Sequence, residues 1–119
     1  MLAVLAPLLR QGRLGVCGIT AMEHLYSSRG QDDLERRRSS LDLYEWVDTD
    51  ERDLQSALEV QRTLAQRGQL RSVGVVDLVT AAVAERHRLT LLHYDQDFDV
   101  VAGVTGQPTQ WVVPRGSVD

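Results

Sequence analysis

This chain contains the segment Gly74-Val-Val-Asp-Leu-Val-Thr-Ala-Ala-Val-Ala-Glu85, followed shortly by Leu91-Leu-His-Tyr-Asp-Gln-Asp-Phe98. The first segment predicts a helix of small residues with an acid, Asp77, in its first turn. The second predicts a short apolar strand with Asp95 just beyond its end. In a sheet flanked by helices, ligands bind at the carboxyl ends of strands and at helix N-termini, so we expect Asp77 and Asp95 to lie close together. Two carboxylates placed in this way suit a hard divalent cation such as Mg²⁺.

Each of these acids also has an explanation that involves no chemistry. Asp77 in a first helical turn gains about 0.3–1 kcal/mol from the helix dipole. We expect Asp97 to be the N-cap of a helix that begins at Phe98, which leaves Asp95 without a capping role and makes it the better ligand candidate. Asp99 is expected to be a solvated surface acid.

Glu23 belongs to Thr20-Ala-Met-Glu23, which has the pattern of a capping box. In that motif Thr20 caps the third amide of the helix and Glu23 reaches back to the N–H of the cap residue. The other interpretation is a carboxylate that faces a metal just beyond the strand that contains Cys17. The two interpretations compete for the same side chain.

The pattern of the remaining chain is an alternation of strands and helices. This order predicts an α/β sandwich with a mostly parallel sheet, formed by one domain over residues 1–114 and followed by a loose tail at 115–119. We expect helices at residues 2–11, 21–29, 32–42, 50–67, 75–88 and 97–103, and strands at 13–17, 44–47, 89–93 and 109–113.

Composition excludes several classes of protein. The chain has 119 residues, of which 43% are hydrophobic and 25% charged, and no apolar run approaches the ~20 residues that span a bilayer. Its start lacks a basic region and a cleavage site, so we expect no signal peptide. The single cysteine, Cys17, fits a reducing cytoplasm and is expected to be a buried, inert thiol. A net charge of −4 argues against non-specific binding of nucleic acid.

Other candidate sites are weaker. The three histidines show no metal-ligand spacing, and the chain has neither a readable hydrolytic triad nor a glycine-rich phosphate loop. The basic run Arg36-Arg37-Arg38 is expected on the solvated face of a polar helix, with contact to RNA or to a partner as the alternative. Arg71 could point at a phosphate near the Asp77 helix.

Taken together, the chain resembles the PIN-domain proteins, specifically the VapC-type toxins of bacterial toxin–antitoxin pairs. Besides the two segments quoted above, the similarity is carried by Ile19-Thr-Ala-Met-Glu-His-Leu-Tyr26 and Val104-Thr-Gly-Gln-Pro-Thr-Gln-Trp-Val-Val113. The resemblance implies a three-layer α/β/α fold and an endoribonuclease that depends on Mg²⁺ or Mn²⁺. Its substrate would be RNA, often tRNA or ribosomal RNA, and a VapB-like antitoxin would silence it. The acidic cluster would comprise Glu23, Asp77 and Asp95 as metal ligands, with Asp97 as an auxiliary catalytic acid. The apolar helices also suggest a homodimer.

The chain departs from this family at its front. Members begin with an apolar strand that ends in an Asp, and this strand is expected at the centre of the sheet. Here the chain starts with Met1-Leu-Ala-Val and has no such Asp. A missing strand would leave unpaired edges in the sheet and remove a metal ligand, so weak or absent activity is expected. Three explanations are open: a start placed too far downstream, a degenerate relative that only binds the antitoxin, or a sheet that closes without the strand or borrows one.

Overall fold

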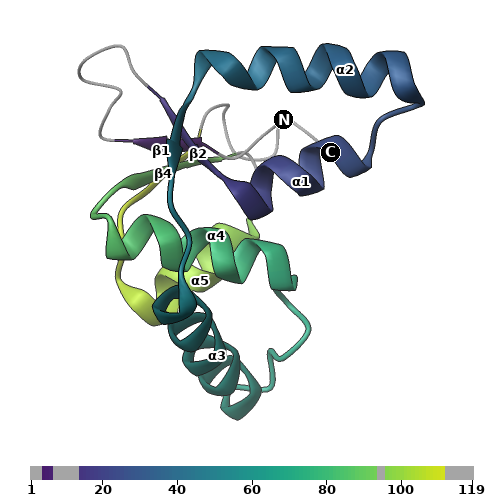
Figure 1. Ribbon diagram of the computed structural model, residues 1–119. Helices are drawn as coiled ribbons and strands as arrows, with labels where there is room; N and C mark the ends of the chain where they lie inside the picture. Colours follow the sequence, from purple (N-terminus) through teal and green to yellow (C-terminus); the bar gives the residue numbers. More distant parts are fainter. Residues whose placement is uncertain (1–3, 7–13, 94–95, 112–119) are drawn as a thin grey trace.

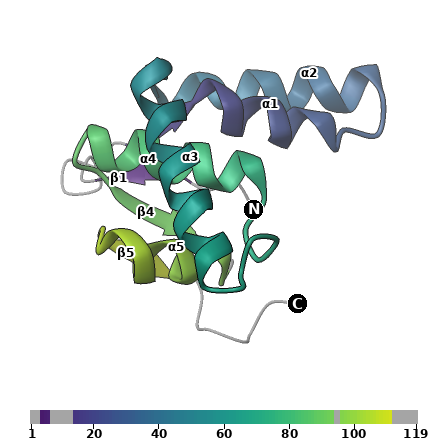
Figure 2. The ribbon, with the colours of Figure 1, turned by 90° about the horizontal axis from the view of Figure 1, so that it is seen from below.

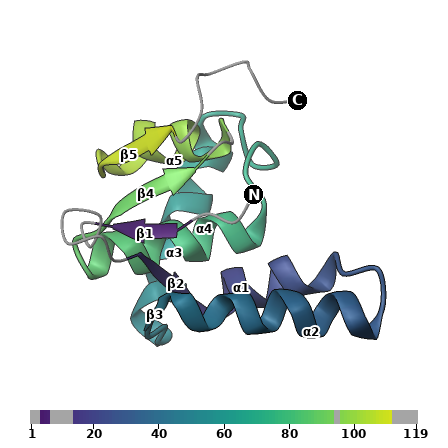
Figure 3. The same cartoon turned by 90° about the horizontal axis from the view of Figure 1, so that it is seen from above.

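A computed structural model describes residues 4–6, 14–93 and 96–111 (Figure 1). Its centre is a five-stranded sheet in the order β3-β2-β1-β4-β5. β2 pairs in parallel with β3, and β4 in parallel with β5, whereas β1 is antiparallel to both of its neighbours. Because β2 and β4 both run against β1, their carboxyl ends lie at the same edge of the sheet (Figure 3). The strands are β1 (Val4–Ala6), β2 (Gly15–Cys17), β3 (Glu45–Val47), β4 (Thr90–His93) and β5 (Thr109–Trp111).

β1 corrects two expectations. The helix predicted over residues 2–11 is wrong, because Val4–Ala6 is a strand. The central position of the sheet is therefore filled by the chain itself, with Leu5 opposite both Gly15 and Leu91. Local sequence explains part of this, since Ala6 precedes Pro7 and a residue before proline avoids the helical conformation. Pairing on both sides supplies the backbone hydrogen bonds that a helix would otherwise have provided. The short connection to β2 fixes the antiparallel direction.

Most helices match the predicted ranges to within a few residues. The largest shift is at α1, which begins three residues before the predicted start. α3 begins with a capping box that was not predicted. Asp50 accepts from the amide of Arg52, and Asp53 accepts from the amide of Asp50 at 2.9 Å. The helices are α1 (Gly18–Tyr26), α2 (Gln31–Ser40), the 3-10 turn η2 (Leu41–Leu43), α3 (Glu51–Gln66), α4 (Val75–Arg86) and α5 (Asp97–Thr105).

Helices cover the two faces of the sheet unequally: in the view from above, β1, β4 and β5 lie in front of the helices (Figure 3). α3, α4 and α5 lie together on one side, and the α1–α2 pair lies above and beside the sheet next to β2 (Figures 1 and 2). Side chains alternate between the faces of a strand, and β2 follows this rule. Cys17 packs into the main core with Leu64, Val83 and Leu91, whereas Val16 packs with Ala21 of α1 and with Leu41. The predicted three-layer α/β fold is confirmed, and so is the burial of Cys17.

A charged network joins β3 and α3 to the end of α4. The Asp53 side chain is only 1% exposed and accepts two hydrogen bonds from Arg86, at 2.7 and 3.0 Å. Arg86 also donates to the carbonyl and the carboxylate of Asp48. Burial alone raises the pKa of Asp53, but the hydrogen bonds from Arg86 and from the Asp50 amide outweigh it and hold the pKa below its usual value. None of the helices in the described ranges is long and apolar enough to cross a membrane.

Candidate active site

A buried chain of hydrogen bonds joins the two helices that carry the candidate acids. Thr80 of α4 donates to the carbonyl of Val76 at 2.8 Å and bonds the hydroxyl of Thr20 of α1. Thr20 in turn lies 3.2 Å from the Cys17 sulfur. Each hydroxyl has only one proton. Because the proton of Thr80 is given to Val76, the proton of Thr20 goes to Thr80, and the Cys17 thiol donates to Thr20.

This arrangement corrects the capping-box prediction. α1 begins at Gly18, its N-cap is Cys17, and no side chain caps it. Thr20 therefore lies inside the helix and is spent on the contact with Thr80. Glu23 is exposed and makes no hydrogen bond or ion pair within the described part of the chain. The helix leaves Glu23 available for another role.

The Thr20–Thr80 contact places Glu23 and Asp77 on the same side of the helix pair. Glu23 lies one turn after Thr20, and Asp77 lies one turn before Thr80. α1 and α4 run in opposite directions (Figure 1). The turn from Thr20 to Glu23 and the turn from Thr80 back to Asp77 therefore extend in the same direction from the threonine contact. One small pocket confirms the proximity of the two turns, since its lining includes both Glu23 and Val76, the residue before Asp77. Asp77 is half-buried in the first turn of α4, as predicted.

The other described acids, Asp97 and Asp99, lie in the first turn of α5, shortly after β4 in the chain. The prediction that Asp97 is the N-cap of α5 is wrong. Asp97 is the first helical residue, and Gln96 holds the cap position. Asp99 is half-buried in the same turn, so it is not the fully solvated acid expected. Asp95 lies outside the described residues, two positions after the end of β4 at His93. β4 and β2 end at the same sheet edge, and α1, which carries Glu23, follows β2 directly at that edge.

The donor set suits a hard cation, because every candidate is a carboxylate. Among the described residues, no three His, Cys, Asp or Glu side chains come together as a ligand set. Glu23, Asp77 and Asp97 alone therefore do not form one, and the predicted cluster depends on Asp95. The grouping of Glu23, Asp77 and Asp95 stays a prediction.

The basic run divides into one structural residue and two surface residues. Arg37 donates to the carbonyl of His24 and to Ser27 Oγ, at 2.9 and 2.8 Å, and so ties α2 to the end of α1. Burial and the charge of Arg37 lower the pKa of His24. Arg36 and Arg38 are exposed, which agrees with the expected solvated face. Arg71 is exposed in the loop before α4.

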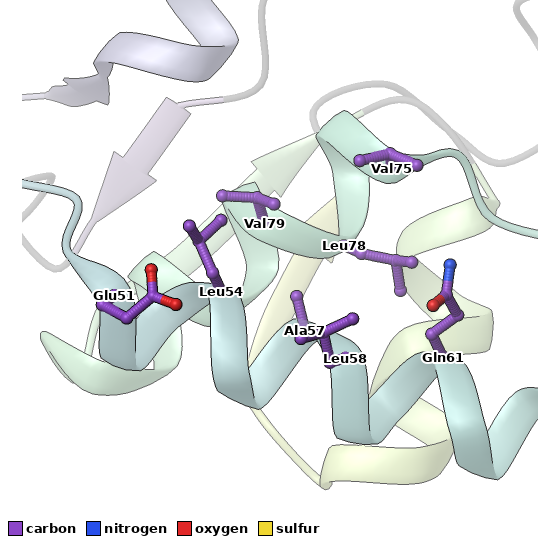
Figure 4. Close-up of a pocket in the computed structure, with 8 residues that line it drawn as sticks. All are labelled: Glu51, Leu54, Ala57, Leu58, Gln61, Val75, Leu78 and Val79. Atoms are coloured by element: carbon purple, nitrogen blue, oxygen red, sulfur yellow. The ribbon is translucent and has the colours of Figure 1, made fainter.

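A second, larger hollow lies between α3 and α4 (Figure 4). It has a volume of about 250 Å³ and an almost wholly apolar lining, with Glu51 and Gln61 as its only polar residues. Leu54 and Leu58 line it from α3 and are 41% and 54% exposed, and Val75 lines it from α4. Exposed apolar side chains gathered in this way mark surfaces that bind other proteins. We call this hollow the α3–α4 groove.

Comparison with known proteins gives the family. The family model described as "PIN domain" matches residues 3–104, a range that contains all four candidate acids. The chain belongs to the PIN-domain family. This PIN domain is 41% identical to Ribonuclease VapC51 of Mycobacterium tuberculosis, an alignment that covers 95% of this chain and 82% of that protein. It is 42% identical to Ribonuclease VapC21 of the same species, covering 95% and 83% of the two chains.

A solved structure supports the same fold. The PIN domain superposes with a TM-score of 0.58 on a member of the VapBC family of toxin–antitoxin systems, VapBC-5 from Mycobacterium tuberculosis. The two chains are 23% identical, and the match covers 79% of this chain and 76% of the other. The resemblance inferred from the sequence motifs is confirmed.

Proposed function

We propose that this PIN-domain chain is a metal-dependent endoribonuclease, the toxin of a VapBC-like toxin–antitoxin pair, acting in the cytoplasm. One observation carries the proposal. The Thr20–Thr80 contact sets Glu23 of α1 beside the first turn of α4, where Asp77 lies, in a chain that matches VapC ribonucleases over 95% of its length. The substrate would be single-stranded or looped RNA, such as tRNA or ribosomal RNA.

The proposed roles follow from where each acid lies. Asp77 and Asp95 would hold Mg²⁺ or Mn²⁺, Glu23 would complete the ligand shell or position water, and Asp97 would support from the start of α5. When bound, such a cation lowers the pKa of coordinated water and stabilises charge on the phosphate. Asp77 lies in the first turn of α4, where the positive end of the helix dipole attracts a negative charge. Glu23 is exposed, so RNA and water can reach it.

The partner in this proposal is a VapB-like antitoxin, and the α3–α4 groove suits it. Leu54 and Leu58 are four residues apart on one face of α3, which is the spacing that meets the apolar face of a partner helix. The groove is separate from the pocket that contains Glu23, so an antitoxin segment docked there would anchor the complex without using catalytic side chains. A homodimer through the same apolar helices is the competing occupant.

A second candidate function is an impaired PIN domain that only binds the antitoxin. One observation favours it: the central strand, Val4–Ala6, contains no acid, and the first acidic residue of the chain is Glu23. The family resemblance implies an Asp at the end of that strand. In this alternative the antitoxin complex forms normally and RNA is not cut.

Cleavage of labelled RNA by the purified chain separates the two functions. The nuclease proposal predicts cleavage in Mn²⁺ that EDTA stops. Asp77→Asn should reduce cleavage by at least the roughly 10- to 100-fold that is lost with a residue that only orients a metal ligand. Asp32→Asn, on the exposed start of α2, is the matched control and keeps full activity. Absence of cleavage by the wild type, with normal antitoxin binding, would select the impaired form.

A further inference from the structure

The pocket beside Glu23 has a composition that metal binding does not explain. Its lining comprises four residues of α1 (Ile19, Met22, Glu23, Tyr26) and Val76 of α4, around a volume of about 180 Å³. Met22 is 66% exposed and Tyr26 is 90% exposed. Glu23 is therefore flanked on its own helix by a thioether and by an aromatic ring that faces solvent.

The chemistry of the lining limits what can bind. It contains no basic side chain, so a phosphate is not attracted, and its only charge is that of Glu23. A volume of about 180 Å³ is below the roughly 300–1,000 Å³ of sites for drug-sized ligands, so it holds one ring system. Aromatic rings exposed on nucleic-acid-binding proteins stack with unpaired bases. A flat, uncharged base fits this lining.

We propose that this pocket is a base-binding subsite, in which an unpaired RNA base stacks on Tyr26 beside the phosphate that is cut. The inference rests on the proposed nuclease function and adds a contact that would set the position of the RNA. Because Glu23 lies in the same lining, a base held there is adjacent to the candidate metal ligands. The subsite therefore positions the nucleotide next to the cleaved bond.

An apolar side chain of a protein partner is the competing occupant. The α3–α4 groove fits a protein better, because it is larger and has two leucines at helical spacing (Figure 4). The pocket beside Glu23 is smaller, and its lining includes a candidate catalytic acid. An RNA substrate would use both side chains, with Glu23 at the cleaved phosphate and the Tyr26 ring against a base.

The test measures binding of a short fluorescein-labelled single-stranded RNA of mixed sequence by fluorescence anisotropy. Ca²⁺ replaces Mn²⁺, because it takes the same oxygen ligands in a looser geometry. We expect Tyr26→Ala to weaken binding by about 5- to 150-fold, the range for loss of one base–aromatic stack. Tyr26→Phe keeps the ring and binds as the wild type does. Trp46→Ala removes an exposed aromatic from β3, outside the pocket, and leaves binding unchanged.

Two outcomes overturn the inference, and they are distinguishable. If the wild type binds the RNA and cuts it in Mn²⁺ while Tyr26→Ala binds equally well, the subsite is wrong and the nuclease proposal stands. If the wild type neither binds nor cuts the RNA, the proposed function fails and this subsite fails with it. Because Tyr26 is 90% exposed, Tyr26→Ala should unfold at the wild-type temperature, which thermal melting checks.

Discussion

Replacing Thr80 by Val removes the hydroxyl that joins α4 to α1 while keeping the shape of the side chain. Thr80 is 1% exposed, and its hydroxyl accepts from Thr20 and donates to the Val76 carbonyl. In Thr80→Val the proton of Thr20 loses its acceptor and retains only the Cys17 sulfur, a weak one, at 3.2 Å. In Thr20→Val, by contrast, Thr80 still donates to Val76. The two substitutions are therefore unequal.

The expected losses differ accordingly. An unsatisfied buried donor costs about 1–3 kcal/mol, so Thr80→Val should lower the free energy of unfolding by about 2 kcal/mol. Thr20→Val loses the bond to Thr80 and the weak bond from the Cys17 thiol but orphans no hydroxyl. Since a satisfied hydrogen bond is worth about 0.5–1.5 kcal/mol and a thiol is a weak donor, this variant should cost about 1 kcal/mol. The double variant leaves no orphaned hydroxyl and should cost less than the sum of the two. For a chain of this length, 1 kcal/mol corresponds to about 3–6 °C in Tm.

The spacing between Glu23 and Asp77 should change together with the stability of the fold. If the threonine pair sets the spacing of Glu23 and Asp77, then Thr80→Val lowers RNA cleavage by about 10- to 100-fold at a temperature where the variant is fully folded, because small misplacements are costly in catalysis. Thr80→Ser keeps the hydroxyl and should retain cleavage. Thr63→Val on α3 is the matched control, since Thr63 makes no side-chain hydrogen bond within the described residues.

Urea unfolding and cleavage kinetics of these variants decide the matter. Thr80→Val that is no less stable than Thr20→Val would refute the assignment of protons along the chain. A destabilised Thr80→Val with wild-type cleavage would refute the positioning role and leave a purely structural contact.

Two further predictions concern the charged network and the groove. Asp53→Ala should lower the free energy of unfolding by about 3 kcal/mol at pH 7, the lower end for breaking a buried pair, because Arg86 keeps Asp48 as a partner. The folded-state pKa of Asp53 is depressed, so its contribution to stability is present above the unfolded pKa of about 4 and is lost as the pH falls through the folded value. Urea unfolding from pH 7 down to pH 2 should therefore show a smaller loss of unfolding free energy in Asp53→Ala than in the wild type. Equal losses in the two proteins would contradict this. Leu58→Asp places a charge in the α3–α4 groove and should weaken binding of the VapB-like antitoxin by about 10-fold or more, measured by calorimetry. Leu43→Asp, at a leucine that is 87% exposed outside the groove, should bind normally, and equal effects of the two would exclude the groove.

Local sequence predicted most of the elements, because their signals are local. The long helix α3 has apolar residues at helical spacing, and α4 follows from its run of small residues after Asp77. β1 was mispredicted because one of its two pairing partners, β4, lies far along the chain, although the Ala6-Pro7 step was a local sign of extended backbone.

The candidate site was predictable in its residue types and less so in its contacts. Thr20 matched a capping pattern, but its partner is Thr80, sixty positions away. The cap predicted for Asp97 failed by one residue, a usual uncertainty at helix ends. The burial of Asp53 against Arg86 depends on the packing of α3 on α4, which no local sequence pattern predicts. No sequence pattern singled out Tyr26, because the exposure of its ring beside Glu23 becomes visible only in the fold.

Titration of the chain with Mn²⁺ by calorimetry tests the central claim most directly, because it asks whether the acids on α1, on α4 and after β4 form one cation site. We predict saturable binding by the wild type that weakens by about 10-fold or more in Asp77→Asn and in Asp95→Asn, and that Asp32→Asn leaves unchanged. Wild-type protein without saturable binding, or equal affinity in all of these variants, would contradict it.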